Sequence, residues 1–407
     1  MRIILFDEVR ATADFFTYLW KEEFERRGHE VYVVHMNHFE EGKKDLIAFL
    51  SVYPDLILGY NNSPFSLEVI PGKNFWDTLG VPVVNILFDH PGAYWKILEV
   101  APKVSIPACC DRNHLKFLDR FFPEMRKGVF IPHYGLELPG EVVPWEERKI
   151  PVLYVGSPSF PGGQQDEFAT KVIEILSIDT SKTVESAMEE VVLSCTLEFL
   201  RNHFIEIWQY LESEDLYGKL PEADAISFEM EMYLEEALRK YHYLHAHITS
   251  RHRRMLVKQL VEAGIDVYAY SDWSNEKDLL ANPHFHFGGM VSPMECVELM
   301  RDSKIVLNSM PWFKDGNHDR ICHGMLQHAV VFSETSNYLE ERFTDGEDIK
   351  LFTLQQLEQG DVVPEIVKDI LNNPDLAKRI AQKGYESAKI NDTVKNRVDT
   401  LLDFLGK

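Results

Sequence analysis

Polar side chains that can bind an anion are concentrated between Ser303 and Glu334, a stretch that begins and ends with apolar runs typical of buried strands. The run "KIVLNS" predicts a strand that ends near Asn308, and "HDRICHGMLQH" predicts a helix that begins near His318 and Arg320. Exposed N–H groups and the helix dipole favour anions at a helix N-terminus. We therefore expect His318 and Arg320 to face a phosphate group.

Two other segments have residue types suited to phosphate. "YVGSPSFPGG" predicts a strand followed by a glycine-rich loop, in which Gly156 and Ser157 would offer backbone N–H groups. "TSRHRRMLVKQL" places Arg253, Arg254 and other basic residues at the start of a helix, where a bound diphosphate would offset their unfavourable position. An ordinary strand-end turn and a solvated basic helix face remain the alternatives for these two segments.

A second group of candidates follows strands in the first third of the chain. "NILFDHPG" places Asp89 and His90 after a predicted strand, and "IPHYG" places His133 after another. A carboxylate and an imidazole at the carboxyl end of parallel strands suit acid/base work on an acceptor hydroxyl. Asp89 as a helix cap or turn residue is the alternative.

A metal site is not expected in the stretch from Ser303 to Glu334. His318, His323 and His328 are separated by five residues each, and not by the four that place two imidazoles on one helical face. The five cysteines form no CxxC pair, so neither a zinc knuckle nor a disulfide framework is indicated.

The elements that position these residues form two α/β units. Continuous apolar runs of strand length alternate with helical patterns, which predicts parallel sheets covered on both faces. In the first unit, residues 1–140, these runs are "RIILF", "EVYVVHM", "DLILGY", "VPVVNILFD", "KVSIPAC" and "GVFIPHYG". In the second unit, residues 150–385, they are "IPVLYVG", "DVYAYS", "KIVLNS" and "AVVFSE". Residues 165–248 predict a helical insertion, and residues 386–407 predict a closing helix.

The overall composition excludes several classes of function. The chain has 407 residues and a formal net charge of −23, which disfavours nucleic acid and anionic lipid as partners. No apolar run approaches the 18 residues that a membrane span needs, and Asp7 and Glu8 interrupt the first apolar run, so no signal peptide is expected. We expect a reduced, cytoplasmic protein.

The set of motifs resembles the CgeB-like, or spore-protein-type, glycosyltransferases of the GT-B fold. That group shows a strand ending in Leu-Asn, a variable loop, an Arg at a helix start and a strand ending in an acid, which appear here as "KIVLNS", "PWFKDGNH", Arg320 and "AVVFSE". "YVGSPSF", "RRMLVKQLVEAGIDVYAYSDW" and "VPVVNILFDHP" match further segments, so the resemblance covers roughly 320 residues. Ser271 and His328 stand where the group has glycine, and His323 stands where related enzymes have Glu.

The resemblance implies two Rossmann-like domains facing a cleft and sugar transfer from a nucleotide-sugar donor without a metal or another cofactor. The donor would be a UDP-sugar, with GDP- and dTDP-sugars as alternatives. The implied donor and phosphate residues are Gly156, Ser157, Arg254, Asn308, His318, Arg320, Ser333 and Glu334. The implied acceptor side comprises Asp89, His90 and His133, with Asp89 and His318 as catalytic residues.

Other functions of the same fold remain open at this point. A nucleotide-sugar epimerase or hydrolase would bind the same donor, whereas a non-catalytic binding protein would turn over none. The acceptor is a protein, a glycan or a small molecule, and the insertion at 165–248 either binds it, mediates oligomerisation or caps the core.

Overall fold

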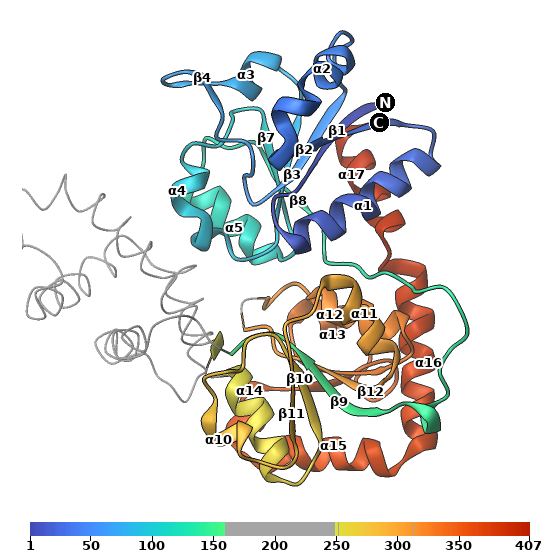
Figure 1. The fold of residues 1–407 in the computed structure, drawn as a ribbon. Helices are drawn as coiled ribbons and strands as arrows, with labels where there is room; N and C mark the ends of the chain where they lie inside the picture. The colour runs from blue at the N-terminus through green and yellow to red at the C-terminus, as the bar shows by residue number, and fades with distance from the viewer. Residues whose placement is uncertain (159–248, 251, 312) are drawn as a thin grey trace, which may run out of the picture.

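The computed structural model describes residues 1–158, 249–250, 252–311 and 313–407, arranged as two α/β domains (Figure 1). The insertion expected at 165–248, and Arg251 of the basic segment, lie outside the described residues. Each domain contains a six-stranded parallel sheet, as the continuous apolar runs predict.

The N-terminal sheet has the strand order β2-β1-β3-β6-β7-β8. Its strands are β1 (Arg2–Asp7), β2 (Glu30–His35), β3 (Leu56–Tyr60), β6 (Val83–Leu87), β7 (Ser105–Cys109) and β8 (Val129–Phe130). Its helices are α1 (Ala11–Arg26), α2 (Phe39–Phe49), α3 (Phe75–Leu79), α4 (Trp95–Leu98) and α5 (Arg112–Phe121), and β4 (Glu68–Ile70) pairs with β5 (Lys73–Asn74) in a separate hairpin.

The C-terminal sheet has the strand order β11-β10-β9-β12-β13-β14. Its strands are β9 (Ile150–Val155), β10 (Val267–Tyr270), β11 (Phe285–Gly289), β12 (Ser303–Asn308), β13 (Val330–Glu334) and β14 (Lys350–Phe352). Its helices are residues 252–262, α10 (Lys277–Leu280), α11 (Pro293–Arg301), α12 (Asp319–Leu326), α13 (Asn337–Arg342), α14 (Leu354–Glu358), α15 (Val362–Asn372) and α16 (Pro374–Asn391).

The last helix, α17 (Val394–Leu405), returns to the N-terminal domain and closes its core (Figure 1). Val398 and Leu401 are fully buried and belong to the same apolar cluster as Trp20 and Phe24 of α1. Truncation of a core leucine to alanine costs about 2–5 kcal/mol of stability. This helix therefore contributes substantially to the stability of a domain that lies more than 250 residues earlier in the chain.

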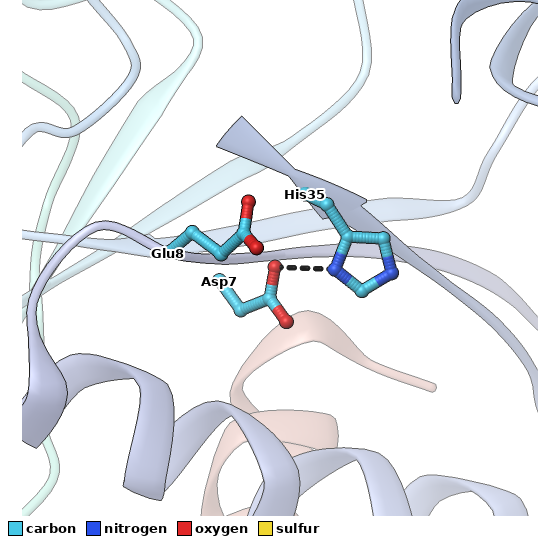
Figure 2. A group of neighbouring side chains, drawn as sticks. All are labelled: Asp7, Glu8 and His35. Carbon is cyan, nitrogen blue, oxygen red and sulfur yellow. Dashed lines mark hydrogen bonds and ion pairs between the residues drawn. The ribbon is translucent and has the colours of Figure 1, made fainter. Parts of the chain in front are cut away.

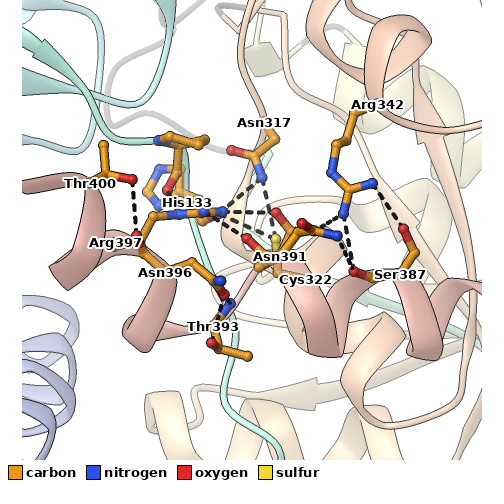
Figure 3. Close-up of polar contacts among 12 residues, drawn as sticks. His133, Asn317, Cys322, Arg342, Ser387, Asn391, Thr393, Asn396, Arg397 and Thr400 are labelled. Carbon is orange, nitrogen blue, oxygen red and sulfur yellow. Dashed lines mark hydrogen bonds and ion pairs between the residues drawn. The ribbon is translucent and has the colours of Figure 1, made fainter. Parts of the chain in front are cut away.

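A buried ion network at the junction of α16 and α17 ties the interdomain linker to the C-terminal domain (Figure 3). Arg397 donates to Asp392 Oδ1 at 2.8 Å and to the carbonyl oxygens of Pro132 and His133 at 2.6 and 2.9 Å. Asp392 also accepts from Arg342 at 3.0 Å. The linker that carries His133 is therefore fixed by two helices of the C-terminal half.

The carboxyl edges of the two sheets meet where the loop after β12 contacts the loop after β7. Asp111 caps α5 and its Oδ2 accepts from the backbone N–H of Asp315 at 2.7 Å. A Cβ at Gly316 would lie 2.2 Å from the carbonyl oxygen of Cys110, so only glycine fits this contact. None of the helices in the described parts of the chain is both long and apolar enough to cross a membrane.

Candidate active site

The candidate donor site is built where β12 and β13 end and α12 begins. Asn308 and Ser333 are fully buried at the ends of neighbouring strands, and Asn308 Nδ2 donates to Ser333 Oγ at 2.9 Å. This bond orients the Asn308 amide, so that its Oδ1 accepts from the guanidinium of Arg320. The structure thus brings together three of the residues that the sequence predicted.

Arg320 is a buried cation whose hydrogen-bond partners are neutral groups. It is 6% exposed, its Nη1 also lies 3.4 Å from the carbonyl oxygen of Ser309, and its guanidinium carbon lies 5.6 Å from the ring centre of Tyr154. No carboxylate within the described residues forms an ion pair with it, and burial lowers the pKa of Arg320. A buried charge without a counter-charge is costly, and a bound anion would supply the missing partner.

His318 is the N-cap of α12 and remains uncharged at neutral pH. Its Nδ1 lies 3.3 Å from the Arg320 backbone N–H and beside the carboxylate of Asp319, and its Nε2 lies 3.0 Å from Arg320 Nη2. Burial, followed by the charge of Arg320, lowers the pKa of His318 to about 3. The neutral imidazole therefore holds the guanidinium in place without repelling it.

Glu334 completes the buried floor of the site at the end of β13. It is 1% exposed and pairs with Lys314 Nζ at 2.5 Å, while its Oε2 accepts from the backbone N–H of Met310 at 3.1 Å. The pairing fixes the loop after β12 to the neighbouring strand. Lys314 was not among the predicted site residues, because a lysine inside a Pro- and Gly-containing loop has no periodic signal.

The glycine-rich loop after β9 lies over Tyr154, which the sequence shows only as one more residue of an apolar strand. Gly156 has a φ of 154°, and a Cβ at this position would lie 3.4 Å from the Tyr154 hydroxyl. That hydroxyl is buried and has no hydrogen-bond partner among the described residues. Arg253 Nη1 donates to the Ser157 carbonyl at 2.7 Å, so this basic residue contacts the loop.

Within the described residues, Arg254 does not contact the glycine-rich loop but pairs with Glu276. It forms a two-pronged ion pair with Glu276, with nitrogen–oxygen distances of 2.8–3.0 Å, and its side chain is partly exposed. Its predicted phosphate contact would require this ion pair to open.

The acceptor-side residues divide into two groups. The His133 ring stacks on Phe88 and on His318, each at 5.7 Å between ring centres, so it bridges the two domains beside the donor site. Burial lowers the pKa of His133, which keeps this ring neutral as well. Asp89 is exposed after β6, and its Oδ2 accepts from the Tyr94 hydroxyl at 2.6 Å.

His90, by contrast, is packed inside the N-terminal domain. Its Nδ1 accepts from the Gly92 backbone N–H at 3.0 Å, and its ring contacts His114 and Phe117 at 4.7 and 4.8 Å. These contacts give His90 a structural role.

The other two histidines of α12 and its C-terminal end have separate packing roles. His323 Nδ1 accepts from the Leu136 backbone N–H at 2.9 Å, and burial lowers its pKa. His328 adopts a left-handed φ of 57° and stacks on Tyr385 at 3.8 Å. His318, His323 and His328 thus face different partners.

Comparisons with known proteins support the assignment of the fold. Residues 249–403 match a family model described as glycosyl transferase-like. An alpha-glucosyltransferase in complex with UDP and a 13-mer DNA containing a central A:G mismatch superposes with a TM-score of 0.51 at 12% identity, and 100% of both chains is covered. The chain has the GT-B fold. The family-model match supports the prediction of a glycosyltransferase.

Two further solved structures are similar at lower TM-scores. Sucrose-phosphate synthase from Thermosynechococcus elongatus has a TM-score of 0.48 at 9% identity, covering 100% of this chain and 98% of the other. Anabaena HepE in complex with UDP-glucose has a TM-score of 0.46 at 11% identity, covering 100% and 99%. No curated protein sequence matches the chain.

Proposed function

We propose that the chain is a glycosyltransferase that moves a sugar from a nucleotide-sugar donor to an acceptor hydroxyl. We further propose that the donor is a UDP-sugar and that the chain belongs to the CgeB-like enzymes. The observation that carries this proposal is Arg320, a buried guanidinium without a carboxylate partner in the described chain, at the start of α12. The choice of UDP is supported by the alpha-glucosyltransferase of the same fold, which was solved with UDP. GDP- and dTDP-sugars are the alternatives.

In this proposal, Arg320 and the N-terminus of α12 stabilise the diphosphate as it leaves the sugar. Hydrogen-bond donors that are already oriented in a water-excluded site stabilise the developing charge of the transition state far more than water does, because they need no reorganisation. Ser333 and Asn308 hold Arg320 from one side, and neutral His318 holds it from the other. The transfer step itself then needs no metal at the diphosphate.

The loops around this cation would bind the rest of the donor. Gly156 and Ser157 lie next to Tyr154, whose buried hydroxyl is unpartnered in the described chain and suits a phosphate or sugar oxygen. Glu334, held by Lys314, forms the floor of the site. Arg254 would contribute a second cation if its ion pair with Glu276 opens on binding.

Across the domain boundary, Asp89 would act as the general base that takes the proton from the acceptor hydroxyl. The Tyr94 hydroxyl orients its carboxylate at 2.6 Å, and His133 lies beside the donor site to position the acceptor. We further propose that the insertion at 165–248 contributes to acceptor recognition or to oligomerisation.

The test measures UDP release and UDP binding separately. Purified protein is incubated with UDP-, GDP- and dTDP-sugars, first with water as acceptor and then with added sugar acceptors, and nucleotide release is quantified. We expect release from a UDP-sugar that an acceptor accelerates. Asp89→Asn should slow release by about 10²–10⁴-fold while leaving the UDP dissociation constant unchanged.

The control is Glu68→Gln, on the exposed β4 strand, which should retain both release and binding. Release that yields only free sugar with every acceptor would indicate a hydrolase. Absence of both nucleotide release and nucleotide binding would contradict the proposal and favour a non-catalytic role.

A further inference from the structure

A group of carboxylates and an imidazole lies at the carboxyl ends of β1 and β2 in the N-terminal domain (Figure 2). Asp7 ends β1, Glu8 follows it with a left-handed φ of 57°, and His35 ends β2. The two strands are parallel neighbours with Asp7 directly opposite His35, so the sheet register itself brings these side chains to one place.

The three side chains have the spacing of metal ligands. One potential ligand atom from each of Asp7, Glu8 and His35 lies within 4.8 Å of the others, and Asp7 Oδ1 is 2.8 Å from His35 Nδ1. Ligand atoms bound to one tetrahedral Zn²⁺ at 2.0–2.2 Å are about 3.3 Å apart. Small rotations of the Glu8 and His35 side chains would therefore place all three atoms around one cation.

Neighbouring groups orient both carboxylates. Asp7 is 4% exposed, and its Oδ2 accepts from the Tyr18 hydroxyl at 2.6 Å, which leaves Oδ1 directed at His35. The Glu8 carboxylate accepts from the Asn37 backbone N–H at 2.9 Å and lies 2.9 Å from His38 Nδ1. Such outer hydrogen bonds fix ligand orientation in protein metal sites.

The charge of the group also suits a cation. Asp7 and Glu8 form ion pairs only with the imidazoles of His35 and His38 within the described chain, and with no lysine or arginine. Adjacent carboxylates repel one another, and a divalent cation would neutralise both.

We propose that Asp7, Glu8 and His35 bind a divalent transition-metal ion through Asp7 Oδ1, the Glu8 carboxylate and His35 Nδ1. An imidazole with two carboxylates suits Zn²⁺ better than Mg²⁺, which prefers oxygen ligands and water. This site goes beyond the proposed function, because the diphosphate contacts of Arg320 lie in the other domain and involve none of these residues.

The experiment is a calorimetric titration of ZnCl₂ and MgCl₂ into tag-free protein that has been treated with EDTA. We expect Zn²⁺ to bind more tightly than Mg²⁺, and both His35→Gln and Glu8→Gln to weaken Zn²⁺ binding by at least about tenfold. The two substituted side chains are 53% and 28% exposed, so neither change disturbs the core.

Two matched variants serve as controls. His286→Gln removes an imidazole that pairs with Asp266 at 3.0 Å, and Glu40→Gln removes an exposed carboxylate paired with Lys43. Both should leave this Zn²⁺ site intact, and all four variants should bind UDP as the unmodified protein does. Zn²⁺ binding that is absent, no tighter than Mg²⁺ binding, or unchanged in His35→Gln and Glu8→Gln would overturn the proposal.

Discussion

Replacement of Arg320 by methionine separates a ligand-binding role from a structural role. In the ligand-free protein the guanidinium contacts the neutral acceptors Asn308 and His318 and the ring of Tyr154. Removing a buried charge that has no counter-charge does not leave an unpaired ion behind, and well-packed apolar replacements of buried ions are often neutral or stabilising. Asn308 Oδ1 loses its donor at the same time, which offsets this gain, so the free energy of unfolding of Arg320→Met should change by no more than about 1 kcal/mol.

The same substitution should weaken the binding of UDP. Truncating one member of a buried, hydrogen-bonded charge pair costs about 2–4 kcal/mol of binding, which corresponds to roughly a 30- to 900-fold higher dissociation constant. Calorimetric titration with UDP measures this change, and urea unfolding measures the stability. Unchanged UDP affinity would contradict a ligand-binding role of Arg320, and a loss of several kcal/mol of stability would indicate a structural role instead.

Arg148 provides the matched control for this experiment. It is also a buried arginine without a carboxylate hydrogen bond. It lies at the amino ends of β9 and β12, and it donates to the carbonyl oxygens of Val143, Ser303 and Gln327. Arg148→Met would leave these carbonyls without their donor, so it should lose stability and retain UDP affinity.

Two further predictions follow from packing and protonation. Gly135→Ala should lose about 1–3 kcal/mol of stability and weaken UDP binding, because its Cβ would lie 2.6 Å from the Cys322 backbone in α12. Gly42→Ala in α2 should instead be stabilising. Equal effects of the two substitutions on stability would contradict this prediction. The free energy of unfolding should fall between pH 7 and pH 5.5, and in His318→Asn this fall should be smaller by about 1 kcal/mol, as measured by urea unfolding. The reason is that the pKa of folded His318 is about 3, whereas the unfolded residue gains a proton below pH ~6.5. Its contribution is thus present above pH ~6.5 and falls as the pH falls, and an unchanged pH dependence would count against a neutral buried ring.

Much of the fold follows from apolar runs, and the departures have physical causes. The run "GVFIPHYG" predicts a strand of eight residues, but β8 ends at Phe130. Pro132 cannot donate to a sheet, and the following segment is held by Arg397 as the interdomain linker. Strand β11 is an edge strand in which Phe287 and Gly288 are exposed, and its sequence "FHFGG" lacks the apolar continuity of the central strands.

The candidate site was predictable where strand ends determine it. Asn308, Ser333 and Arg320 come together because parallel strands β12 and β13 end at one edge. Tyr154 could not be found in this way, since its contact with Arg320 depends on β9 lying next to β12.

The same strand-end rule, applied to β1 and β2, would have indicated the group formed by Asp7, Glu8 and His35. Ser271 and His328, which stand where the resembling family has glycine, both adopt left-handed φ values, of 98° and 57°. The backbone at these positions thus keeps a conformation that favours glycine even though the residue has changed.

A crystal structure of the protein with UDP bound would show directly where the diphosphate lies. We expect its oxygens to lie within hydrogen-bond distance, about 3 Å, of the Arg320 guanidinium and to face the start of α12. A diphosphate bound elsewhere, with Arg320 still contacting only Asn308, Ser309 and His318, would contradict this expectation.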